Sequence, residues 1–517
     1  MTKPDRSGGQ PSPSELHSPP RYADLILAAL NAHPGRAAFH WSDGSRRQKQ
    51  TYGQTAEQIL RLSSVLSGLG LDHTAGISLL TGPRPEAFTF MAASCHAGIR
   101  FSALHPMATR HDDDYVLRDS GCAVLLVDDT DARFDERAQS AASAVTVVPL
   151  TEFVASAQRS QPSTEPAKQA TYLFYTGGTT GEPKGVILRD RSLTANAWAS
   201  ATWPWPPDTR FLISTPMSHA AGLLVAPGLM RDAEFCIQER FEPARVREAI
   251  ESDGVNATFM VPTMLYALLD HLRAENKDLQ GLKWLLYGAA PTIPARIIEA
   301  RERLGPVLTQ HYGQAEAPNA LTMLAQDAHL TDDQAILASC GRPMPGVQLA
   351  LLNEVGDPVP TGSPGELCVR GPLVMDGYWN KPEQTAAALA DGWLHTGDLA
   401  VRDSSGNISI VDRLKDLIIT GGFNVYPREV ENALNAHPAV ATCAVYGEPD
   451  DRWGESVVAA VVLKADHDTS AEELTSHVRS VKGSVWAPKR IDFYERLPVT
   501  ALGKMDKQHM RRRHPRN

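Results

Sequence analysis

The sequence predicts an α/β protein with a large N-terminal domain of parallel-rich sheets flanked by helices, a small β-barrel-like part, and a smaller α+β C-terminal domain. Three observations predict it. Buried strands and amphipathic helices alternate through the first part of the chain, which is typical of parallel sheets covered on both faces. Short strands and turns follow Gly346, and a second mixture of helices and strands begins near residue 417. The length of 517 residues also exceeds the roughly 250–300 at which one hydrophobic core stops growing.

The first elements follow from the spacing of apolar residues. Helical spacing runs from Arg21 to Leu30 and again from Thr51 to about Leu69. The apolar run Gly76–Leu80 predicts a buried strand, and Glu86–His96 predicts the helix behind it. Further strands are expected at Cys122–Asp129, Val145–Leu150, Ala170–Tyr175, Thr258–Pro262 and Trp284–Gly288. In parallel sheets, ligands gather at the carboxyl ends of such strands.

The pattern changes beyond Gly346. Short strands at Gln348–Leu352, Gly365–Val369 and Asn407–Val411 predict the β-barrel-like part, at about 346–412. Then come helices at Glu429–Asn435 and Ala471–Val481, with strands at Val440–Val445 and Ser456–Leu463. We therefore expect a disordered leader (1–20), an N-terminal domain (21–412), a hinge (413–416) and a C-terminal domain (417–517).

Composition disfavours several classes of protein. A formal net charge of −10 gives no support to nucleic-acid binding. The six cysteines are scattered without CxxC spacing, which argues against a zinc site or a disulfide framework and favours a reducing cytoplasm. The sequence contains no run of 18 apolar residues, so no transmembrane helix is expected. The N-terminus is polar and lacks the apolar segment of a signal peptide.

The most informative segment is the loop Tyr175–Val186, which reads YTGGTTGEPKGV. Its glycines, threonines and lysine can surround a polyphosphate with backbone N–H groups, hydroxyls and a positive charge. The loop is not a Walker A motif, because Lys184 is followed by Gly185 rather than by Ser or Thr. A solvated Gly/Thr turn is the alternative explanation.

This loop resembles the phosphate-loop signature of the adenylate-forming superfamily, which contains acyl-CoA synthetases, adenylation domains of peptide synthetases and firefly-type luciferases. Further motifs follow in the order of that family, over nearly the whole chain, at His311–Glu316, Trp393–Leu399, Asp412–Asp416 with Gly421–Pro427, and Pro498–Lys504. The resemblance implies an acid–thiol ligase that forms AMP. ATP converts a carboxylic acid to an acyl-adenylate and pyrophosphate, and CoA then takes the acyl group and releases AMP.

The resemblance also implies roles at the nucleotide. Lys504 is expected to stabilise charge in the adenylation step, and Glu316 with Thr179 is expected to hold Mg²⁺. Asp398 is expected at the ribose. Arg413 is expected at the ribose or the phosphates, with a salt bridge beside the hinge as the alternative. The whole nucleotide-binding set comprises Thr176, Gly177, Gly178, Thr179, Thr180, Gly181, Lys184, Gly288, Ala289, Ala290, His311, Tyr312, Gly313, Gln314, Asp398 and Arg413. The alternative to each nucleotide-binding role is a purely structural one: a surface lysine at 504, a turn aspartate at 398 and a core aromatic at 312.

One position departs from the family pattern. Residue 315 is alanine where the family usually has Thr or Ser, whose hydroxyl meets the α-phosphate. The loss of one hydrogen bond to a charged group costs about 1.5–3 kcal/mol unless another group replaces it. This departure bears on catalytic efficiency and leaves the reaction class unchanged.

The second half-reaction is expected to depend on domain rotation. Lys415 matches the hinge of the family, at which the C-terminal domain turns and exchanges Lys504 for a glycine loop. Gly421, Gly422 and Phe423 are expected along the CoA pantetheine channel, because small residues let the arm pass close to the backbone. An ordinary Gly-Gly turn is the alternative explanation.

The acyl pocket is expected to be mostly apolar or small. Its candidate residues are His219, Leu223, Met264, Gly288 and Gln314. His219 is grouped with the catalytic residues because the resemblance implies that it gates the acid or the thiol; a core histidine is the alternative. No general base is needed, since a carboxylate is already ionised at pH 7. The pocket candidates include no lysine or arginine to pair with a second carboxylate and no acidic residue to hold an amino group, so a hydrophobic monocarboxylic acid is expected.

Two other functions stay open. A stand-alone adenylating enzyme would pass its acyl-adenylate to a carrier protein or to another enzyme. This function stays open because Ala315 departs from the family pattern. A non-catalytic nucleotide-binding protein is disfavoured by Lys504, Asp398, Arg413 and Glu316 together. The expected partners are a small acid, ATP and CoA, with no nucleic acid, and a homodimer is left open.

Overall fold

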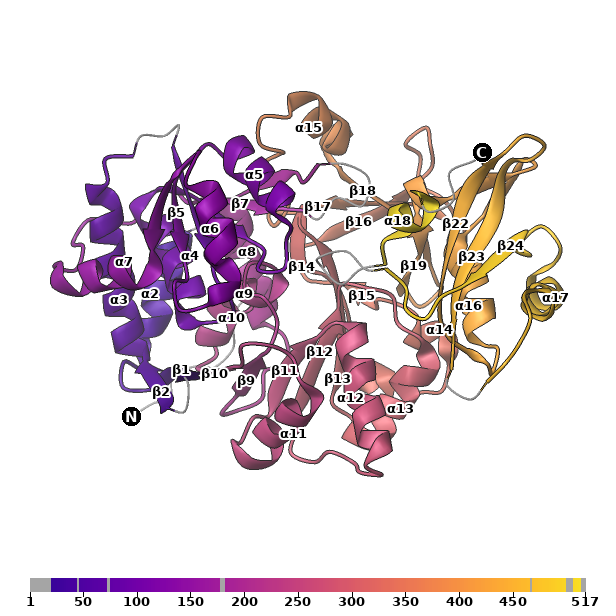
Figure 1. Cartoon of the computed structure of the whole chain (residues 1–517), viewed down its shortest axis with the longest axis horizontal. Coiled ribbons are helices and arrows are strands. Elements are labelled where there is room, and N and C mark those ends of the chain that lie inside the picture. Colours follow the sequence, from indigo (N-terminus) through magenta and orange to yellow (C-terminus); the bar gives the residue numbers. More distant parts are fainter. Residues whose placement is uncertain are drawn as a thin grey trace. The chain divides into compact units, whose positions relative to one another are not determined.

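The structure is a computed structural model that describes residues 20–43, 46–71, 75–176, 182–464, 467–498 and 505–512. The chain forms two compact units. Unit 1 comprises Met1–Thr176, Glu182–Gln348 and Arg370–Leu394, and unit 2 comprises Gly177–Gly181, Leu349–Val369 and His395–Asn517. Figure 1 shows the elements of both units, coloured along the sequence. All but the last residue of the expected leader lies outside the described ranges.

One sheet of unit 1 has six strands among the described residues, in the order β6-β5-β3-β4-β7-β8. All neighbours are parallel except β7 and β8, which form an antiparallel pair. The strands are β3 (Gly76–Leu80), β4 (Arg100–Leu104), β5 (Cys122–Val127), β6 (Thr146–Pro149), β7 (Thr171–Tyr175) and β8 (Gly185–Arg189). The helices along this part of the chain are α2 (Tyr22–Ala32), α3 (Tyr52–Gly68), α4 (Pro85–Ala97), α5 (Arg110–Asp119), α6 (Asp135–Ala141), α7 (Leu150–Arg159) and α8 (Asp190–Ala201).

The local sequence explains these elements. Every residue of β3 is buried, as expected for a strand covered on both faces. Helix α3 begins with a capping box, in which the Thr51 hydroxyl accepts from the Gln54 N–H and the Gln54 side chain accepts from the Thr51 N–H. Helix α4 has proline at its first position and ends at Gly98, which has a left-handed backbone (φ 71°).

The second sheet of unit 1 has nine strands within the described ranges, in the order β15-β14-β13-β12-β11-β9-β10-β1-β2. Its centre is parallel, and the pairs β1–β2, β13–β14 and β14–β15 are antiparallel. The strands are β1 (Ala37–Asp43), β2 (Arg46–Thr51), β9 (Arg210–Ile213), β10 (Glu234–Ile237), β11 (Ala257–Met260), β12 (Trp284–Gly288), β13 (Leu308–Gln314), β14 (Ala317–Leu324) and β15 (Arg342–Pro343). The helices are α9 (Ala220–Leu223), α10 (Val225–Leu229), α11 (Pro243–Ser252), α12 (Pro262–Ala274), α13 (Pro294–Leu304), α14 (Gln334–Leu337) and α15 (Pro382–Ala388).

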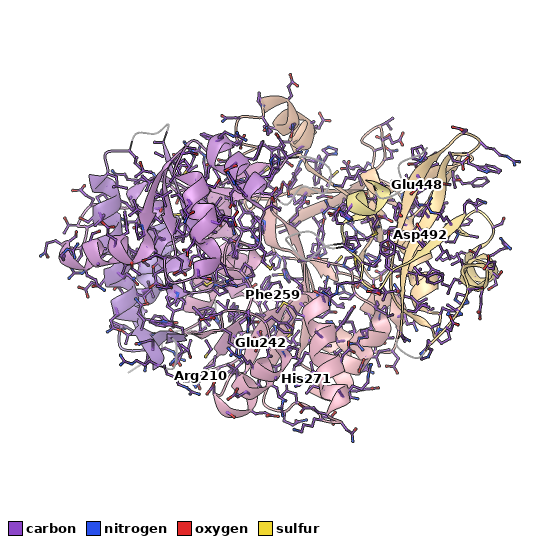
Figure 2. The ribbon with its side chains drawn as sticks, viewed as in Figure 1. Arg210, Glu242, Phe259, His271, Glu448 and Asp492 are labelled. Atoms are coloured by element: carbon purple, nitrogen blue, oxygen red, sulfur yellow. The ribbon has the colours of Figure 1, made fainter. Side chains whose placement is uncertain are left out.

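Unit 2 contains two further sheets. Strands β16 (Gln348–Leu352), β17 (Gly365–Arg370), β18 (Leu394–Arg402) and β19 (Ile408–Arg413) follow one another in one sheet. The other sheet contains β20 (Ile418–Thr420), β21 (Phe423–Val425), β22 (Val440–Asp450), β23 (Gly454–Leu463) and β24 (Arg490–Phe493). Its helices are α16 (Pro427–Asn435), α17 (Ala471–Lys482) and α18 (Lys507–Arg512). Arg490 pairs with Glu448 and Asp492, so that β24 is tied to β22 (Figure 2).

The predicted fold class is confirmed: parallel-rich sheets with helices dominate unit 1, and unit 2 is a smaller mixture of strands and helices. Each element expected from the sequence is present, with ends shifted by a few residues or, for β22, a longer strand. Among the described residues, no helix is both long and apolar enough to cross a membrane. The antiparallel hairpin β13–β14, which contains the predicted adenine and metal residues, was not expected.

Candidate active site

The predicted phosphate loop joins the antiparallel strands β7 and β8. Tyr175 pairs with Gly185 at their ends. The Thr176 N–H donates to the Lys184 carbonyl oxygen (3.0 Å), and the Lys184 N–H is 3.3 Å from the Thr176 hydroxyl. These contacts close the base of the loop. The loop residues Gly177, Gly178, Thr179, Thr180 and Gly181 lie outside the described residues.

Glu316, the predicted metal ligand, is held by a residue that the sequence did not single out. The Tyr378 hydroxyl donates to Glu316 Oε1 at 2.7 Å. The Glu316 carbonyl also accepts from the Met375 N–H, at 2.8 Å. Lys184 Nζ lies 4.7 Å from the centroid of the Tyr378 ring, a cation–π contact. Tyr378 therefore links the lysine of the phosphate loop to the candidate metal carboxylate.

Tyr378 is in this place because the segment around it pairs with β8. The Ile187 N–H donates to the Gly377 carbonyl, and the Trp379 N–H donates to the Gly185 carbonyl. Val186 forms an antiparallel bridge with Tyr378 itself. The local sequence does not predict this pairing, because the two segments lie almost two hundred residues apart in the chain. Only the fold could have identified Tyr378.

The hairpin β13–β14 carries Tyr312, Gly313, Gln314 and Glu316. Tyr312 pairs with Thr322, and Ala315 with Glu316 forms the turn, because Gln314 pairs with Ala317. Gly313 is required here, since a Cβ would lie 2.5 Å from the Asn319 backbone nitrogen. Asn319 itself has a positive φ of 54°. The close approach of the Gly313 and Asn319 backbones fixes the geometry of the turn that contains Glu316.

The other predicted adenine contacts follow β12. Ala289 has a φ of 65°, a left-handed conformation that costs a non-glycine residue free energy and that is often found at functional sites. Gly288, one residue earlier, has no room for a side chain, because a Cβ would lie 2.3 Å from the His311 carbonyl oxygen. The strained backbone of Ala289 and the tightly packed Gly288 therefore lie at the positions that the resemblance implies for contacts with the edge of adenine.

His219 lies in an aromatic cluster. Its ring is 5.4 Å from Phe174 and 4.8 Å from His105, measured between centroids, and the Ser218 hydroxyl is 3.0 Å from its Nδ1. Burial, with Arg137 adding to it, lowers the pKa of His105 to about 4, so this neighbour is neutral near pH 7. No motif in the sequence pointed to His105.

A small cavity of about 20 Å³, lined mostly by apolar residues, lies under the His219 loop. Leu223 is among its lining residues, and the polar lining groups are Thr81, Ser218 and Tyr172. The hydroxyls of Thr81 and Tyr172 are already engaged with Asp128 and with the Ser218 carbonyl. The predicted pocket residue Met264 is not among the lining residues that the structure describes and packs against the core around α12.

In unit 2, the predicted ribose residues form a pair. Asp398 on β18 lies opposite Arg413 on β19, and the Arg413 Nε lies 2.8 Å from Asp398 Oδ1. The Asp398 side chain is only 4% exposed, whereas that of Arg413 is 43% exposed. The Asp398 N–H donates to the Thr396 hydroxyl, which in turn donates to the Leu367 carbonyl. The carboxylate is thus held in a fixed turn, together with an exposed cation.

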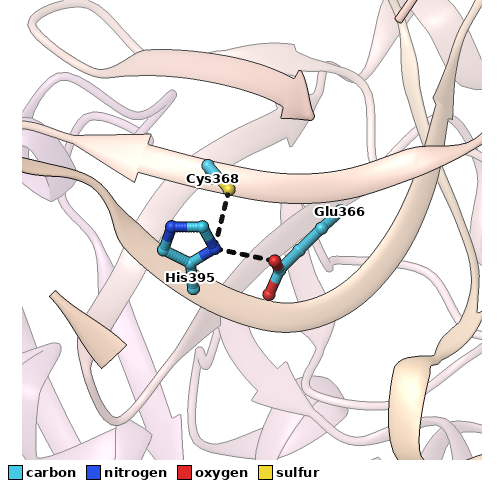
Figure 3. A group of neighbouring side chains, drawn as sticks. All are labelled: Glu366, Cys368 and His395. Atoms are coloured by element: carbon cyan, nitrogen blue, oxygen red, sulfur yellow. Dashed lines mark hydrogen bonds and ion pairs between the residues drawn. The ribbon is translucent and has the colours of Figure 1, made fainter. Parts of the chain in front are cut away.

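A cluster of Glu366, Cys368 and His395 supports the same turn (Figure 3). Glu366 Oε1 accepts from the Gly397 N–H at 3.0 Å, and Glu366 Oε2 is 2.7 Å from His395 Nδ1. These three side chains are of the kinds that bind zinc. Two zinc ligands with bonds of about 2.1 Å, however, lie roughly 3.4 Å apart in a tetrahedral site. The short contact is therefore a hydrogen bond, and burial raises the pKa of the Cys368 thiol to about 12. We interpret the cluster as a brace for Gly397 and Asp398.

The candidate hinge and thiol loop follow β19. Lys415 is exposed, in a single 3₁₀ turn (Leu414–Asp416) between β19 and β20. Gly421 and Gly422 have φ values of 56° and 79° and form the two-residue turn between β20 and β21. Such a turn requires positive φ at both central residues, which explains the two glycines without reference to function.

Gly421 also packs against an exposed tryptophan. Its N–H donates to the Trp453 carbonyl at 2.7 Å, and a Cβ on Gly421 would lie 2.8 Å from the indole ring. Phe423 and Trp453 are 55% and 39% exposed. An exposed aromatic surface therefore borders the glycine turn.

Lys504 lies outside the described residues, but the helix after it is described. Lys507 Nζ, on α18, lies 2.9 Å from Glu431 Oε1 on α16. The Asp412 carboxylate also attracts the Lys507 ammonium electrostatically. Burial alone would lower the pKa of Lys507, and the two carboxylates outweigh it, so the pKa is raised. The Asp412 carboxylate accepts from the backbone N–H groups of Arg413 and Arg428. Helix α18 is thereby fixed to α16 and to the end of β19.

Comparison with known proteins agrees with this geometry. The profile of the AMP-binding enzyme family matches residues 27–379, and the profile of the AMP-binding enzyme C-terminal domain matches residues 429–504. The chain belongs to the AMP-binding enzyme family. This AMP-binding enzyme is 41% identical to a medium/long-chain-fatty-acid–CoA ligase, FadD8, of Mycobacterium tuberculosis, over 96% of the chain and 91% of that protein. It is an acid–CoA ligase that uses ATP and forms AMP.

Two other relatives widen the comparison. A feruloyl-CoA synthase of an Amycolatopsis species is 36% identical, over 90% of this chain and 94% of the relative. The solved structure of the amide bond synthetase McbA from Marinactinospora thermotolerans is 31% identical and has a TM-score of 0.85. It covers 95% of this AMP-binding enzyme and 98% of the solved chain. The relatives thus differ in the acid that they are named for and in the acceptor of the acyl group.

Proposed function

We propose that this AMP-binding enzyme activates a hydrophobic monocarboxylic acid and transfers it to CoA. The lining of the cavity under the His219 loop carries the proposal, because Leu223, Phe88, Phe101 and Met91 line it and no lysine or arginine does so among the described residues. The cavity of about 20 Å³ has room for roughly one water, so these side chains must move apart to admit an acid. A second carboxylate would have no cation to pair with there. The names of the relatives, which refer to a fatty acid and to feruloyl, agree with an apolar acid.

The adenylation step is assigned as follows. The acid's carboxylate oxygen attacks the α-phosphorus of ATP, and the bond to the pyrophosphate oxygen breaks. Lys504 stabilises the negative charge that develops, worth roughly 3–4 kcal/mol for a preorganised cation. Tyr312 contacts adenine with the backbone of Gly288, Ala289 and Ala290, and Asp398 with Arg413 binds the ribose. The fixed Asp398 turn supports this assignment, since a preset carboxylate loses little entropy on binding.

Mg²⁺ is proposed at Glu316, with Thr179 as a second ligand. The residues fit this ion, because Mg²⁺ prefers one or two hard oxygen ligands from the protein together with phosphate oxygens. Glu316 keeps one carboxylate oxygen on Tyr378, which orients the other. When bound, Mg²⁺ neutralises charge on the phosphates. Lys184 adds a second positive charge, because its ammonium lies over the Tyr378 ring.

For the thiol step we propose a hinge at Lys415, a mobile C-terminal domain from 417 to 517, and a pantetheine route beside Gly421, Gly422 and Phe423. The exposed aromatic surface of Phe423 and Trp453 supports this route. The CoA sulfur then attacks the acyl carbon, and AMP leaves. His219 is proposed to gate entry to the acyl carbon from its place between Phe174 and His105.

Transfer of the acyl-adenylate to a carrier protein remains the alternative, and Ala315 is the feature that favours it, since it lacks the usual hydroxyl. We also propose a cytoplasmic location, because all six cysteines are free. A homodimer stays a prediction.

The experiment measures pyrophosphate exchange and thioester formation with a panel of acids, with and without CoA. We expect exchange with apolar monocarboxylates and thioester formation when CoA is present. Lys504→Ala should lose at least about a hundredfold in exchange. Lys464→Ala is the control: it changes an exposed lysine of unit 2 whose ammonium donates to the Pro438 carbonyl, and its exchange rate should not change. Exchange without thioester would favour the carrier-protein reading, and near-normal exchange by Lys504→Ala would remove that assignment.

A further inference from the structure

His311 is a buried histidine, and one of its ring nitrogens has no hydrogen-bond partner among the residues that the structure describes. It lies on β13, is 3% exposed, and its Nδ1 is 2.9 Å from the Asn319 carbonyl oxygen. A carbonyl can only accept, so Nδ1 carries the hydrogen. Burial lowers the pKa of His311 to about 4, which leaves the ring neutral near pH 7. Nε2 is then a hydrogen-bond acceptor, and the described residues offer it no partner.

This acceptor lies beside two features of the candidate acyl site. The Nε2 edge of the ring occupies the space of a Gly288 side chain, since a Cβ there would be 2.9 Å from Nε2. The Asn319 amide donates to the Ala220 carbonyl, and Ala220 directly follows His219. One residue, Asn319, thus contacts both the His311 ring and the loop of the proposed gate.

A matching donor lies in the same cluster. The His311 ring packs between Trp203 and Phe259, at 5.5 Å from each ring centroid, and Figure 2 labels Phe259 on β11. The Trp203 Nε1–H is also buried and has no acceptor among the described residues. Buried polar groups are nearly always hydrogen-bonded in native proteins, so an unused donor and acceptor in one cluster require an explanation. A hydroxyl group can serve both, because it donates one hydrogen bond and accepts others.

We propose that His311 is a specificity residue that accepts a hydrogen bond from a hydroxyl group on the acid, so that the substrate is an apolar acid carrying a hydroxyl. The inference rests on the proposed function, in which Gly288 and the His219 loop border the acyl group. It changes the role first expected for His311, from the nucleotide to the acid. An acid without the hydroxyl would leave the His311 acceptor unpaired in an apolar site, and such sites reject the analogue strongly.

The test uses matched acids that differ by one hydroxyl: 4-hydroxybenzoate and benzoate, 4-hydroxycinnamate and cinnamate, and a hydroxydecanoate and decanoate. We expect kcat/KM for acyl-CoA formation to favour the hydroxylated member of at least one pair by about tenfold or more. His311→Leu should remove that preference, so that the ratio of kcat/KM for the hydroxylated acid to kcat/KM for its unhydroxylated partner falls to about one. If the wild type shows no preference in any pair, the inference is wrong, whatever the variant does.

His329→Leu is the matched control. His329 is 1% exposed and has a pKa lowered to about 4 by burial, but both of its nitrogens are used, by the Ala325 carbonyl and the Tyr287 hydroxyl. Its loss should reduce stability and leave the preference intact. If His311→Leu and His329→Leu keep the same preference, a buried water serves His311 and the inference fails. Acyl-CoA formation from decanoate or cinnamate in all variants would still support the proposed function, so the two failures are separate.

Discussion

At the scale of single residues, the most informative contact is one that the sequence did not predict. Glu316 belongs to a motif of neighbouring residues that can be seen in the sequence. Tyr378 lies 62 residues away in the chain, and only the folded structure shows that its hydroxyl bonds to the Glu316 carboxylate. His105 is similar, because it meets His219 only through the fold. Asp398 and Arg413 were proposed from motifs, and the structure adds their ion pair, which the motifs do not predict. Lys504 stays a prediction.

Tyr378→Phe tests whether the tyrosine positions the metal carboxylate. The change removes a hydrogen bond to a charged group, worth about 1.5–3 kcal/mol, and leaves the ring under Lys184. We expect pyrophosphate exchange to need several-fold more Mg²⁺ for half-maximal rate, with the loss partly recovered at high Mg²⁺. A titration of exchange rate against Mg²⁺ measures this.

Tyr115→Phe is the control, since Tyr115 has a long 3.5 Å contact to Asp119 and does not touch Glu316 in the described structure. An unchanged Mg²⁺ requirement in Tyr378→Phe would contradict the positioning role.

At the scale of elements, the sequence predicted strands and helices well where a short apolar run or a helical spacing was clear. Trp284–Gly288 and Gln348–Leu352 were predicted to the residue. Ser456–Leu463 begins two residues earlier, because its pairing with β22 extends to Gly454 opposite Asp450. Strand direction was not predictable in the same way: the hairpin β13–β14 arises from a bulge and a positive φ at Asn319, which pattern alone does not reveal.

The glycine turn between β20 and β21 separates two roles of glycine. Gly422→Ala introduces backbone strain of roughly 1–2 kcal/mol and no contact, because nothing lies within 4 Å of its Cβ position. Gly421→Ala adds a clash with the Trp453 ring. We therefore expect Gly421→Ala to lose more thioester formation than Gly422→Ala, with pyrophosphate exchange nearly retained in both. Assays of the two half-reactions, together with thermal unfolding, measure the difference.

Gly406→Ala provides the control for strain alone, because Gly406 also has a positive φ (86°) and an open Cβ position but lies in the turn between β18 and β19. If its thioester formation falls as far as that of Gly421→Ala, the glycine turn has no special part in the thiol step.

At the scale of the whole molecule, buried histidines give a pH dependence of stability. His105, His311 and His329 have pKa values lowered to about 4, mainly by burial, against about 6.5 in an unfolded chain. Between pH 6.5 and 4 the unfolded chain binds protons that the folded chain does not. Stability therefore falls as the pH falls through this window, by up to about 1.4 kcal/mol per pH unit for each histidine.

Urea unfolding at pH 5, 6 and 7 measures this dependence. We expect the midpoint to fall toward pH 5 and to depend on pH less steeply in His329→Leu, which removes one of the three groups. An equal slope in the variant would show that His329 titrates normally in the folded protein.

The hairpin β13–β14 has a consequence for how such enzymes diverge. Within the nine residues from 311 to 319 it carries the aromatic proposed to contact adenine, the carboxylate proposed for the metal, the histidine proposed for the acid, and the asparagine that contacts this histidine. An insertion or deletion there would displace all of them together. New acid preferences are therefore expected to evolve by exchange of single side chains such as the one at position 311, while the length of this segment stays constant.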